Sequence, residues 1–233
     1  MGFSNGTPTI STDGLVFAVD AGNGQSYVSG SSDCFNLVSK ITGSLSDSNG
    51  SGMYENINQG TWTFDGVDDM IVGGIFTACD GGSAITLSSW VKAPTGAQSD
   101  SYAIILYKAP SNDFGIYQNN LDNQLTFRVV TSGGTVGING SVDFFDGNWH
   151  HITAVYNGSS IIFYEDGIQI STDSQSGTIN SAVDDLYIGA QIYGGSSYKN
   201  FFNGNIANAK VYNKALTAAE VTQNYNATKG RFI

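Results

Sequence analysis

The stretch DGNWHHITAVYNGSSIIFYEDGIQI, residues 146–170, decides the fold class. It holds two runs rich in β-branched and aromatic residues, His150–Tyr156 and Ile161–Tyr164, and then the pair Asp166-Gly167 before a third apolar run. Such runs favour strands, and an Asp-Gly pair between two of them is typical of a tight hairpin turn. The stretch therefore predicts antiparallel β-structure and not helix.

Short apolar or alternating runs broken by Gly, Asn, Asp and Ser continue through residues 13–210. The other expected strands are Leu15–Val19, Thr61–Phe64, Met70–Val72, Ile85–Val91, Ala103–Tyr107, Phe114–Tyr117, Leu125–Val130, Leu186–Ile188 and Ile206–Tyr212. Residues 21–60 are expected to be mostly loop, with a short strand near Phe35–Val38. So many strands joined by Gly-rich turns predict an all-β, two-sheet antiparallel sandwich.

Alternation along single strands predicts which side chains face the interior. Ile85, Leu87 and Val91 share one face of their strand, and Trp90 points to the other. In LTFRVV, Leu125, Phe127 and Val129 share a face opposite Thr126 and Arg128. The core is expected to be built around the three tryptophans, Trp62, Trp90 and Trp149.

One short helix is predicted near the C-terminus, in KALTAAEVTQNYNA. Thr217 followed by Glu220 makes a capping box, and Leu216 can touch Val221 across the cap. Tyr225 follows Val221 by four residues and so shares its face.

The charge excludes two classes of partner. The net charge is −11, and the nine Lys and Arg residues do not cluster, whereas a nucleic-acid surface needs a basic face. No stretch approaches the ~20 apolar residues of a membrane span. We therefore expect neither nucleic-acid binding nor membrane insertion.

The ends and the cysteines suggest synthesis in the cytoplasm. Met1–Ile10 has no basic start and no apolar run, so no signal peptide is expected. Residues 1–12 are polar and unpatterned, and we interpret them as an arm before the domain at 13–233. Cys34 and Cys79 are expected to be free thiols, since two cysteines do not make a disulfide framework.

The residues of the opening stretch do not combine into a catalytic motif. His150 and His151 are adjacent on a strand and must point apart, and a zinc site needs three or four converging ligands. Glu165 and Asp166 are explained by a hairpin turn, whereas glycoside hydrolysis usually needs two carboxylates that flank the scissile bond. We expect no enzyme activity.

Two other segments are candidate binding sites. FDGVDD, Phe64–Asp69, offers hard oxygen ligands to calcium through Asp68 and Asp69, or it is an Asx-rich turn between strands. The segment QIYGGSSYKNFF carries four aromatic residues among glycines. The four aromatic residues would recognise a glycan, form a protein interface or anchor the segment by their own packing. They are Tyr193, Tyr198, Phe201 and Phe202.

The order of six segments along the chain resembles that of a laminin-G-like domain. The segments are DGLVFAVDAGN, WTFDGVDDMIVG, ITLSSWVKA, the opening stretch, LYIGA and FFNGNIANAKVYNKALTAAEVTQNYNATKGRF. That family belongs to the concanavalin A-like jelly-roll superfamily, and the resemblance covers residues 13 to about 232. TDGLVFAVDAGNGQSYV and the ending are more narrowly similar to single-domain jelly rolls in tailed-bacteriophage structural proteins. The resemblance implies a jelly-roll sandwich.

The superfamily resemblance also implies calcium or carbohydrate binding, with a departure. Where many members have Gly-x-Ile-Asp-Asp/Glu before the last strand, this chain has Ala207 and Asn208 at the two acidic positions, so Asp20, Asp68 and Asp69 are left as possible calcium ligands. The Glu-x-Asp-x-Glu strand of the superfamily's glucanases does not occur here.

The resemblance therefore predicts a non-catalytic virion protein of a tailed phage: a capsid decoration, head fibre or tail component. It would contact other virion proteins in symmetric or repeated copies and reside in the virion after cytoplasmic synthesis. The alternative is a lectin-like carbohydrate-binding adhesion module that recognises a host-surface glycan.

Overall fold

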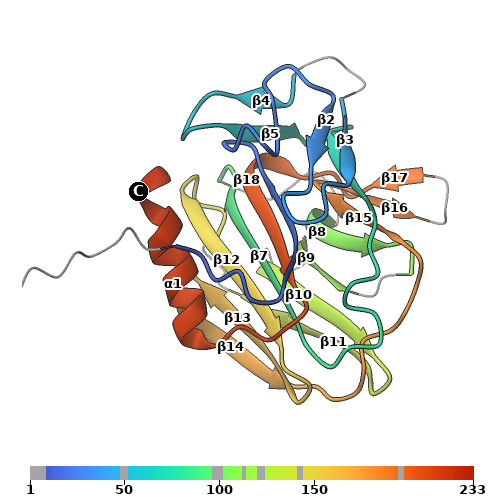
Figure 1. Cartoon of the computed structure of the whole chain (residues 1–233). Helices are drawn as coiled ribbons and strands as arrows, with labels where there is room; N and C mark the ends of the chain where they lie inside the picture. Colours follow the sequence, from blue (N-terminus) through green and yellow to red (C-terminus); the bar gives the residue numbers. More distant parts are fainter. Residues whose placement is uncertain are drawn as a thin grey trace, which may run out of the picture.

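The computed structural model describes residues 9–47, 52–95, 102–111, 114–119, 124–140, 144–193 and 197–233. Two antiparallel sheets pack face to face, and a single helix follows the last strand (Figure 1). The predicted fold class, a two-sheet antiparallel jelly roll with one short C-terminal helix, is confirmed.

The first sheet, sheet A, has the strand order β14-β13-β12-β7-β18-β5-β4, and β1 also pairs with β18. Its strands are β1 (Leu15–Asp20), β4 (Tyr54–Glu55), β5 (Thr61–Asp65), β7 (Ile85–Lys92), β12 (Trp149–Tyr156), β13 (Ser160–Glu165), β14 (Ile168–Ser174) and β18 (Asn203–Tyr212). The opening stretch forms β12, β13 and β14, with the expected turn at Asp166-Gly167.

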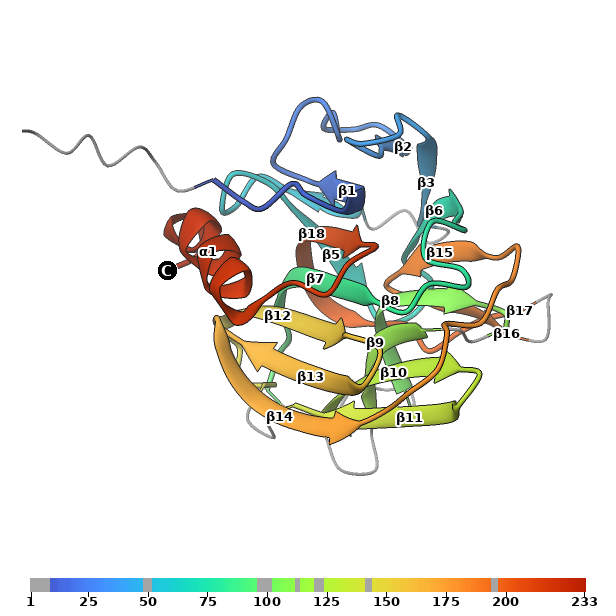
Figure 2. The same cartoon turned by 60° about the horizontal axis from the view of Figure 1, so that its bottom comes forward.

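The second sheet, sheet B, has the order β11-β10-β9-β8-β15-β6-β3-β2. Its strands are β2 (Asp33–Phe35), β3 (Thr42–Ser46), β6 (Met70–Ile75), β8 (Tyr102–Ala109), β9 (Phe114–Asn119), β10 (Gln124–Thr131), β11 (Gly134–Asn139) and β15 (Asp185–Ile188). A separate two-stranded hairpin joins β16 (Gln191–Tyr193) to β17 (Ser197–Lys199). Figure 2 shows the edge strands β14 and β11 of the two sheets side by side.

Every expected strand occurs, but the expectation for residues 21–60 was partly wrong. This segment contributes the edge strands β2 and β4, together with β3, which pairs with β2 and β6. The three strands are two to five residues long and mostly not buried, so their sequences show no apolar alternation. Likewise, no strand was expected in QIYGGSSYKNFF, which supplies the β16–β17 hairpin.

The main core lies between the sheets, with Ile85, Leu87 and Val91 on one side and Phe127 and Val129 on the other. Trp62 belongs to this core, as expected. Trp90 and Trp149 are also buried, but in a second cluster on the opposite face of sheet A. Their expected place in the central core was wrong, because the face of sheet A that they share is covered by the C-terminal segment.

Helix α1 (Ala218–Thr228) covers that outer face of sheet A, and a short 3-10 turn (Lys229–Arg231) follows it. The capping box of Thr217 and Glu220 is present, as predicted. Tyr225 stacks on Trp90 with ring centroids 5.8 Å apart, and Phe232 stacks on its indole at 4.3 Å. In the described residues, no helix has the length and apolar character needed to cross a membrane.

The end of the expected arm is attached to this helix. Ser11 N donates to Asn224 Oδ1 at 2.7 Å, and Gln223 Nε2 donates to the carbonyl of Thr9 at 2.7 Å. The first eight residues of the arm lie outside the described part of the chain.

Candidate functional site

A row of cross-strand neighbours crosses the outer face of sheet B, and two of them, Tyr107 and Arg128, form the floor of a pocket. The strand registers place Tyr187 beside Tyr107, Tyr107 beside Gly115, Gly115 beside Arg128, and Arg128 beside Gly137. These residues come from β15, β8, β9, β10 and β11 in that order. Because cross-strand neighbours share a face, aromatic and cationic groups from distant parts of the chain meet here.

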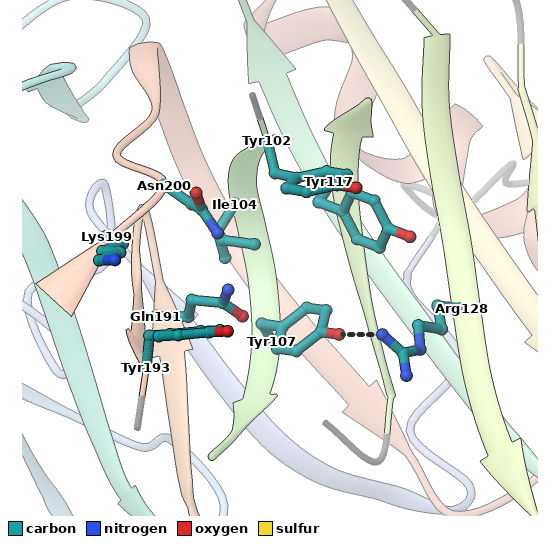
Figure 3. Close-up of a pocket in the computed structure, with 9 residues that line it drawn as sticks. All are labelled: Tyr102, Ile104, Tyr107, Tyr117, Arg128, Gln191, Tyr193, Lys199 and Asn200. Atoms are coloured by element: carbon teal, nitrogen blue, oxygen red, sulfur yellow. Dashed lines mark hydrogen bonds between the residues drawn. The ribbon is translucent and has the colours of Figure 1, made fainter. Parts of the chain in front are cut away.

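The glycine in this row lets Tyr107 lie across the sheet. A Cβ at Gly115 would meet three ring atoms of Tyr107, at distances of 2.0 to 2.7 Å. The phenol thereby reaches towards β10, where Arg128 Nη1 donates to Tyr107 Oη at 3.5 Å (Figure 3). At that length the hydrogen bond is weak, so it orients the guanidinium without satisfying it.

Tyrosines form one wall of the pocket. Tyr102 and Tyr117 meet edge to face with ring centroids 5.5 Å apart, and Tyr117 meets Tyr107 at 5.9 Å. Ile104 of β8 pairs with Tyr117 of β9 and adds an apolar contact to this wall. This arrangement presents ring surface and phenol groups to the same space, which suits a ligand with both apolar and hydroxyl-bearing faces.

The β16–β17 hairpin and the residue after it form the other wall. Gln191, Tyr193, Lys199 and Asn200 line the pocket from this side (Figure 3). The carbonyl of Asn200 accepts from Ile104 N at 2.9 Å, which ties the hairpin to β8. The cavity is open and has a volume of about 460 Å³, within the range of small-molecule sites.

Two polar groups of this pocket lack protein partners. Within the described residues, Arg128 Nε and Gln191 Oε1 are buried and have no hydrogen-bond partner. Arg128 also has no carboxylate partner in that part of the chain, and Gln191 is only 8% exposed. A buried polar group without a partner costs free energy, so such groups facing a cavity indicate that a ligand or water pairs with them.

The structure separates the four aromatic residues predicted from the sequence. Tyr193 lines the pocket, and Tyr198 packs on Tyr187 with centroids 6.2 Å apart, outside the lining set. Phe201 is half-buried, whereas Phe202 is fully buried against Phe64 in the main core. Phe202 is therefore a core residue and not a surface contact.

The other lining residues were missed by sequence reasoning. The outward position of Arg128 was readable from strand alternation, and so was that of Tyr117 in FGIYQN. What the sequence lacked was the pairing of β8, β9 and β15, which brings these positions into one row.

The predicted calcium ligands are only partly brought together. Asp68 and Asp69 meet Asp47 at the rim of the sandwich, where one ligand atom from each lies within 4.8 Å of the others. The FDGVDD segment crosses from sheet A to sheet B there, and β3 pairs with β6 beside it. Asp20 instead accepts from Gly22 N and from Arg231 Nη1 at 2.6 Å, so it is not part of this group.

Asp69 is the member of this cluster with the clearest electrostatic strain. It is 1% exposed, its Oδ2 accepts from Asp65 N, and its Oδ1 has no hydrogen-bond partner in the described residues. Burial, together with neighbouring Asp65, Asp47 and Asp68, raises the pKa of Asp69 to about 6. A cation held by these carboxylates would remove that strain, so the residues fit a calcium ion.

The opening stretch contains a second titratable cluster. His150 Nδ1 lies 3.1 Å from Asp166 Oδ2 and 3.2 Å from Glu165 Oε1, and its Nε2 lies 3.2 Å from Asp146 Oδ1. Chiefly because of the hydrogen bond to Asp166, the pKa of His150 is raised to about 9. A protonated His150 can donate hydrogen bonds from both ring nitrogens. It then forms ion pairs that hold the loop of Asp146 to the turn at Asp166.

His151 points to the opposite face, as predicted. Its Nε2 lies 3.0 Å from Ser88 Oγ, a spacing that a nucleophile and base would share. Ser88 and His151 are 1% and 2% exposed, however, and Tyr225 of α1 lies against the imidazole. Burial lowers the pKa of His151 to about 3, so this pair is a neutral packing contact out of reach of a substrate.

The fold recurs in binding domains of known structure. The binding domain of Paraclostridial Mosquitocidal Protein 1 matches with a TM-score of 0.67 and 16% identity over 92% of this chain and 52% of that one. Domain 4 of AbnA, a GH43 extracellular arabinanase from Geobacillus stearothermophilus in complex with arabinotriose, matches with a TM-score of 0.64 and 15% identity, covering 91% and 98%.

Trypanosoma rangeli sialidase in complex with sialic acid matches with a TM-score of 0.65 and 13% identity, covering 96% of this chain and 34% of that one. The chain thus spans about half the length of the mosquitocidal binding domain and a third of the sialidase. At these identities the likeness concerns the fold. No curated protein of related sequence was found.

A family model matches residues 65–222, more than half of the chain, and these residues include β6 to β18 and the start of α1. That model is Laminin_G_3, described as the concanavalin A-like lectin/glucanases superfamily. The chain belongs to this family of jelly-roll domains.

Proposed function

We propose that this domain binds a saccharide, without catalysis, in the tyrosine-walled pocket on the outer face of sheet B. The observation that carries the proposal is the pocket itself: an open cavity of about 460 Å³ with aromatic walls and two polar atoms that have no hydrogen-bond partner among the described residues. Binding sites of this kind combine apolar lining with a few placed polar groups.

The lining matches the chemistry of a sugar ring. One face of a pyranose or furanose carries C–H groups, which pack on aromatic rings such as those of Tyr117 and Tyr193. Its hydroxyl groups both donate and accept, and the amides of Gln191 and Asn200 can meet either role. Two structural neighbours, the arabinanase domain and the sialidase, are in complex with arabinotriose and sialic acid, which supports a saccharide as the ligand class.

The test is direct binding of the purified chain to a panel of immobilised glycans, with calorimetry on those retained. Tyr193→Ala should weaken binding at least several-fold, because it removes one wall of the pocket. Tyr198→Ala is the matched control, since it removes a half-exposed tyrosine of the same hairpin that does not line the cavity. No glycan bound by the folded chain, or equal losses in the two variants, would contradict the proposal.

A structural role in a virion is the second candidate function. The virion as the location is inferred from the resemblance of the sequence to tailed-bacteriophage structural proteins. A surface feature favours protein contacts: Val38 and Ile41 between β2 and β3, and Ile75 at the end of β6, are exposed apolar side chains. Antibody labelling of purified phage particles would test it, with copy number showing whether the chain is repeated. Particles that lack the chain would contradict this role.

We also propose that Asp47, Asp68 and Asp69 hold calcium at the rim. Bound there, the ion would supply positive charge that offsets the repulsion among these carboxylates. Asp47 follows the end of β3, and Asp68 and Asp69 precede the start of β6, so the ion would tie the crossing between the sheets. Its role would be structural.

A further inference from the structure

The saccharide pocket has a charge opposite to that of the whole chain. The chain carries 20 acidic and nine basic residues, for a net charge of −11. Among the described residues that line the pocket, two are nevertheless cations, Arg128 and Lys199, and none is a carboxylate. The two cations reach it from opposite walls, one from β10 and one from β17.

The two arginines of the chain are in contrasting states. Arg231 is fully engaged: its guanidinium donates to Asp20 Oδ1 at 2.6 Å and to the carbonyls of Asn58 and Gly60. Arg128 has one long hydrogen bond, to the phenol of Tyr107, and an unpartnered buried Nε. A guanidinium is a planar fork that pairs best with an oxyanion, and within the described chain Arg128 has none.

The surroundings of Arg128 leave that fork accessible from the pocket. The neighbour on the β11 side is Gly137, which has no side chain to cover it. The guanidinium lies beside the edge of Tyr107, at the end of the pocket opposite Lys199 (Figure 3). The ammonium of Lys199 lies 4.9 Å from the ring centroid of Tyr193, and Lys199 forms no ion pair among the described residues.

We propose that the ligand of this pocket is an anionic saccharide, with its acid group paired to Arg128 and its ring on the tyrosine walls. This inference rests on the proposed saccharide function and narrows it. A carboxylate and a sulfate share the required chemistry, a delocalised oxyanion that accepts from a guanidinium fork. The net charge of the chain repels anions in general, so a preference for acidic sugars has to arise from this local pairing.

The experiment is calorimetry with matched probes on the intact chain. The probes are sialyllactose and sulfated lactose, each against lactose, and oligogalacturonate against its methyl ester. Wild type should bind an acidic probe about 10-fold or more tightly than its neutral counterpart, the size expected for a charge-assisted hydrogen bond. Which acidic probe is preferred distinguishes carboxylate from sulfate.

Arg128→Gln should abolish that preference, because glutamine keeps a hydrogen-bonding group at this position but carries no charge. Arg128→Lys keeps the charge without the fork and should retain only part of the preference. Lys40→Asn is the control for charge alone, since Lys40 is exposed on the β2–β3 turn and absent from the pocket, and asparagine accepts its positive φ of 61°.

Equal affinity for acidic and neutral probes, or an acid preference that survives in Arg128→Gln, would overturn the inference and leave the saccharide proposal standing. Failure of every probe and every glycan to bind the folded chain would overturn both. Circular dichroism of each variant separates lost binding from lost folding.

Discussion

The ring of Tyr107 lies directly on the backbone of Gly115, so that a Cβ at Gly115 would come within 2.0 Å of Cδ2 of Tyr107. Real side chains do not approach this closely, and the absent side chain is what allows the phenol to reach Arg128. The floor of the pocket therefore depends on a residue with no functional group of its own.

Gly115→Ala is expected to displace Tyr107 and weaken saccharide binding about 10-fold or more. Overpacking should also lower the free energy of unfolding by about 1–3 kcal/mol. Calorimetry and urea unfolding measure the two effects. Gly24→Ala is the control, because a Cβ there has no atom within 4 Å, and unchanged binding in Gly115→Ala would show that Tyr107 does not shape the site.

Calcium should raise the melting temperature of the wild-type chain by several degrees at neutral pH, and EDTA should reverse it. Asp69→Asn should lose this response and, in EDTA, melt above wild type, because the amide removes a buried charge whose Oδ1 has no hydrogen-bond partner in the described residues. Asp33→Asn on the exposed edge of β2 is the control. A calcium response that persists in Asp69→Asn would contradict the assignment.

Asp69 also predicts a pH dependence in calcium-free solution. Its folded pKa of about 6 lies above the ordinary 3.8, so the folded state binds the proton more tightly. Stability attributable to Asp69 should therefore be fully present below about 3.8 and lost as the pH rises through about 6. The melting temperatures of wild type and Asp69→Asn should be compared at each pH across this window. Their difference gives the contribution of Asp69, because the other carboxyl groups titrate in both proteins.

The two histidines should titrate in opposite directions, which proton NMR can follow because the chain has no others. The pKa of His150 is raised to about 9 and that of His151 is lowered to about 3. One imidazole signal should move near pH 9 and the other should stay neutral from pH 5 upward. Stability from His150 is present below the ordinary 6.5 and lost as the pH rises through about 9.

His150→Gln should remove that loss and should lower stability at pH 6, where the imidazolium and its carboxylates are paired. Lys210 is a buried amine whose pKa is lowered to about 8, so it titrates in the same range. Comparing the stability of His150→Gln with that of wild type removes the contribution of Lys210, because both proteins contain it. Two histidine signals that both titrate near 6.5 would contradict this geometry.

Cys34 and Cys79 are both free and buried, and burial raises the pKa of each thiol to about 12. Neither should react with a thiol reagent at pH 8 in the native state, and both should react in denaturant. Reaction of the native chain would mean that the fold opens around one of them.

The sequence by itself determined most of the strands and the helix. The alternation of Leu125, Phe127 and Val129 fixed which face of β10 is buried, since burying a strand's apolar face dictates its period. The capping box of Thr217 and Glu220 fixed the start of α1, because both partners lie within one turn of chain. Local patterns of this kind need no knowledge of neighbours.

Only the tertiary structure decided where the site lies. Tyr187, Tyr107 and Arg128 come from strands far apart in the sequence, and their meeting depends on β8 pairing with both β9 and β15. The tertiary structure also brings Asp47 next to Asp69, buries Phe202 in the main core, and places Trp90 under helix α1. Strand order follows from how two whole sheets bury their faces together, a non-local property that no short run of residues encodes.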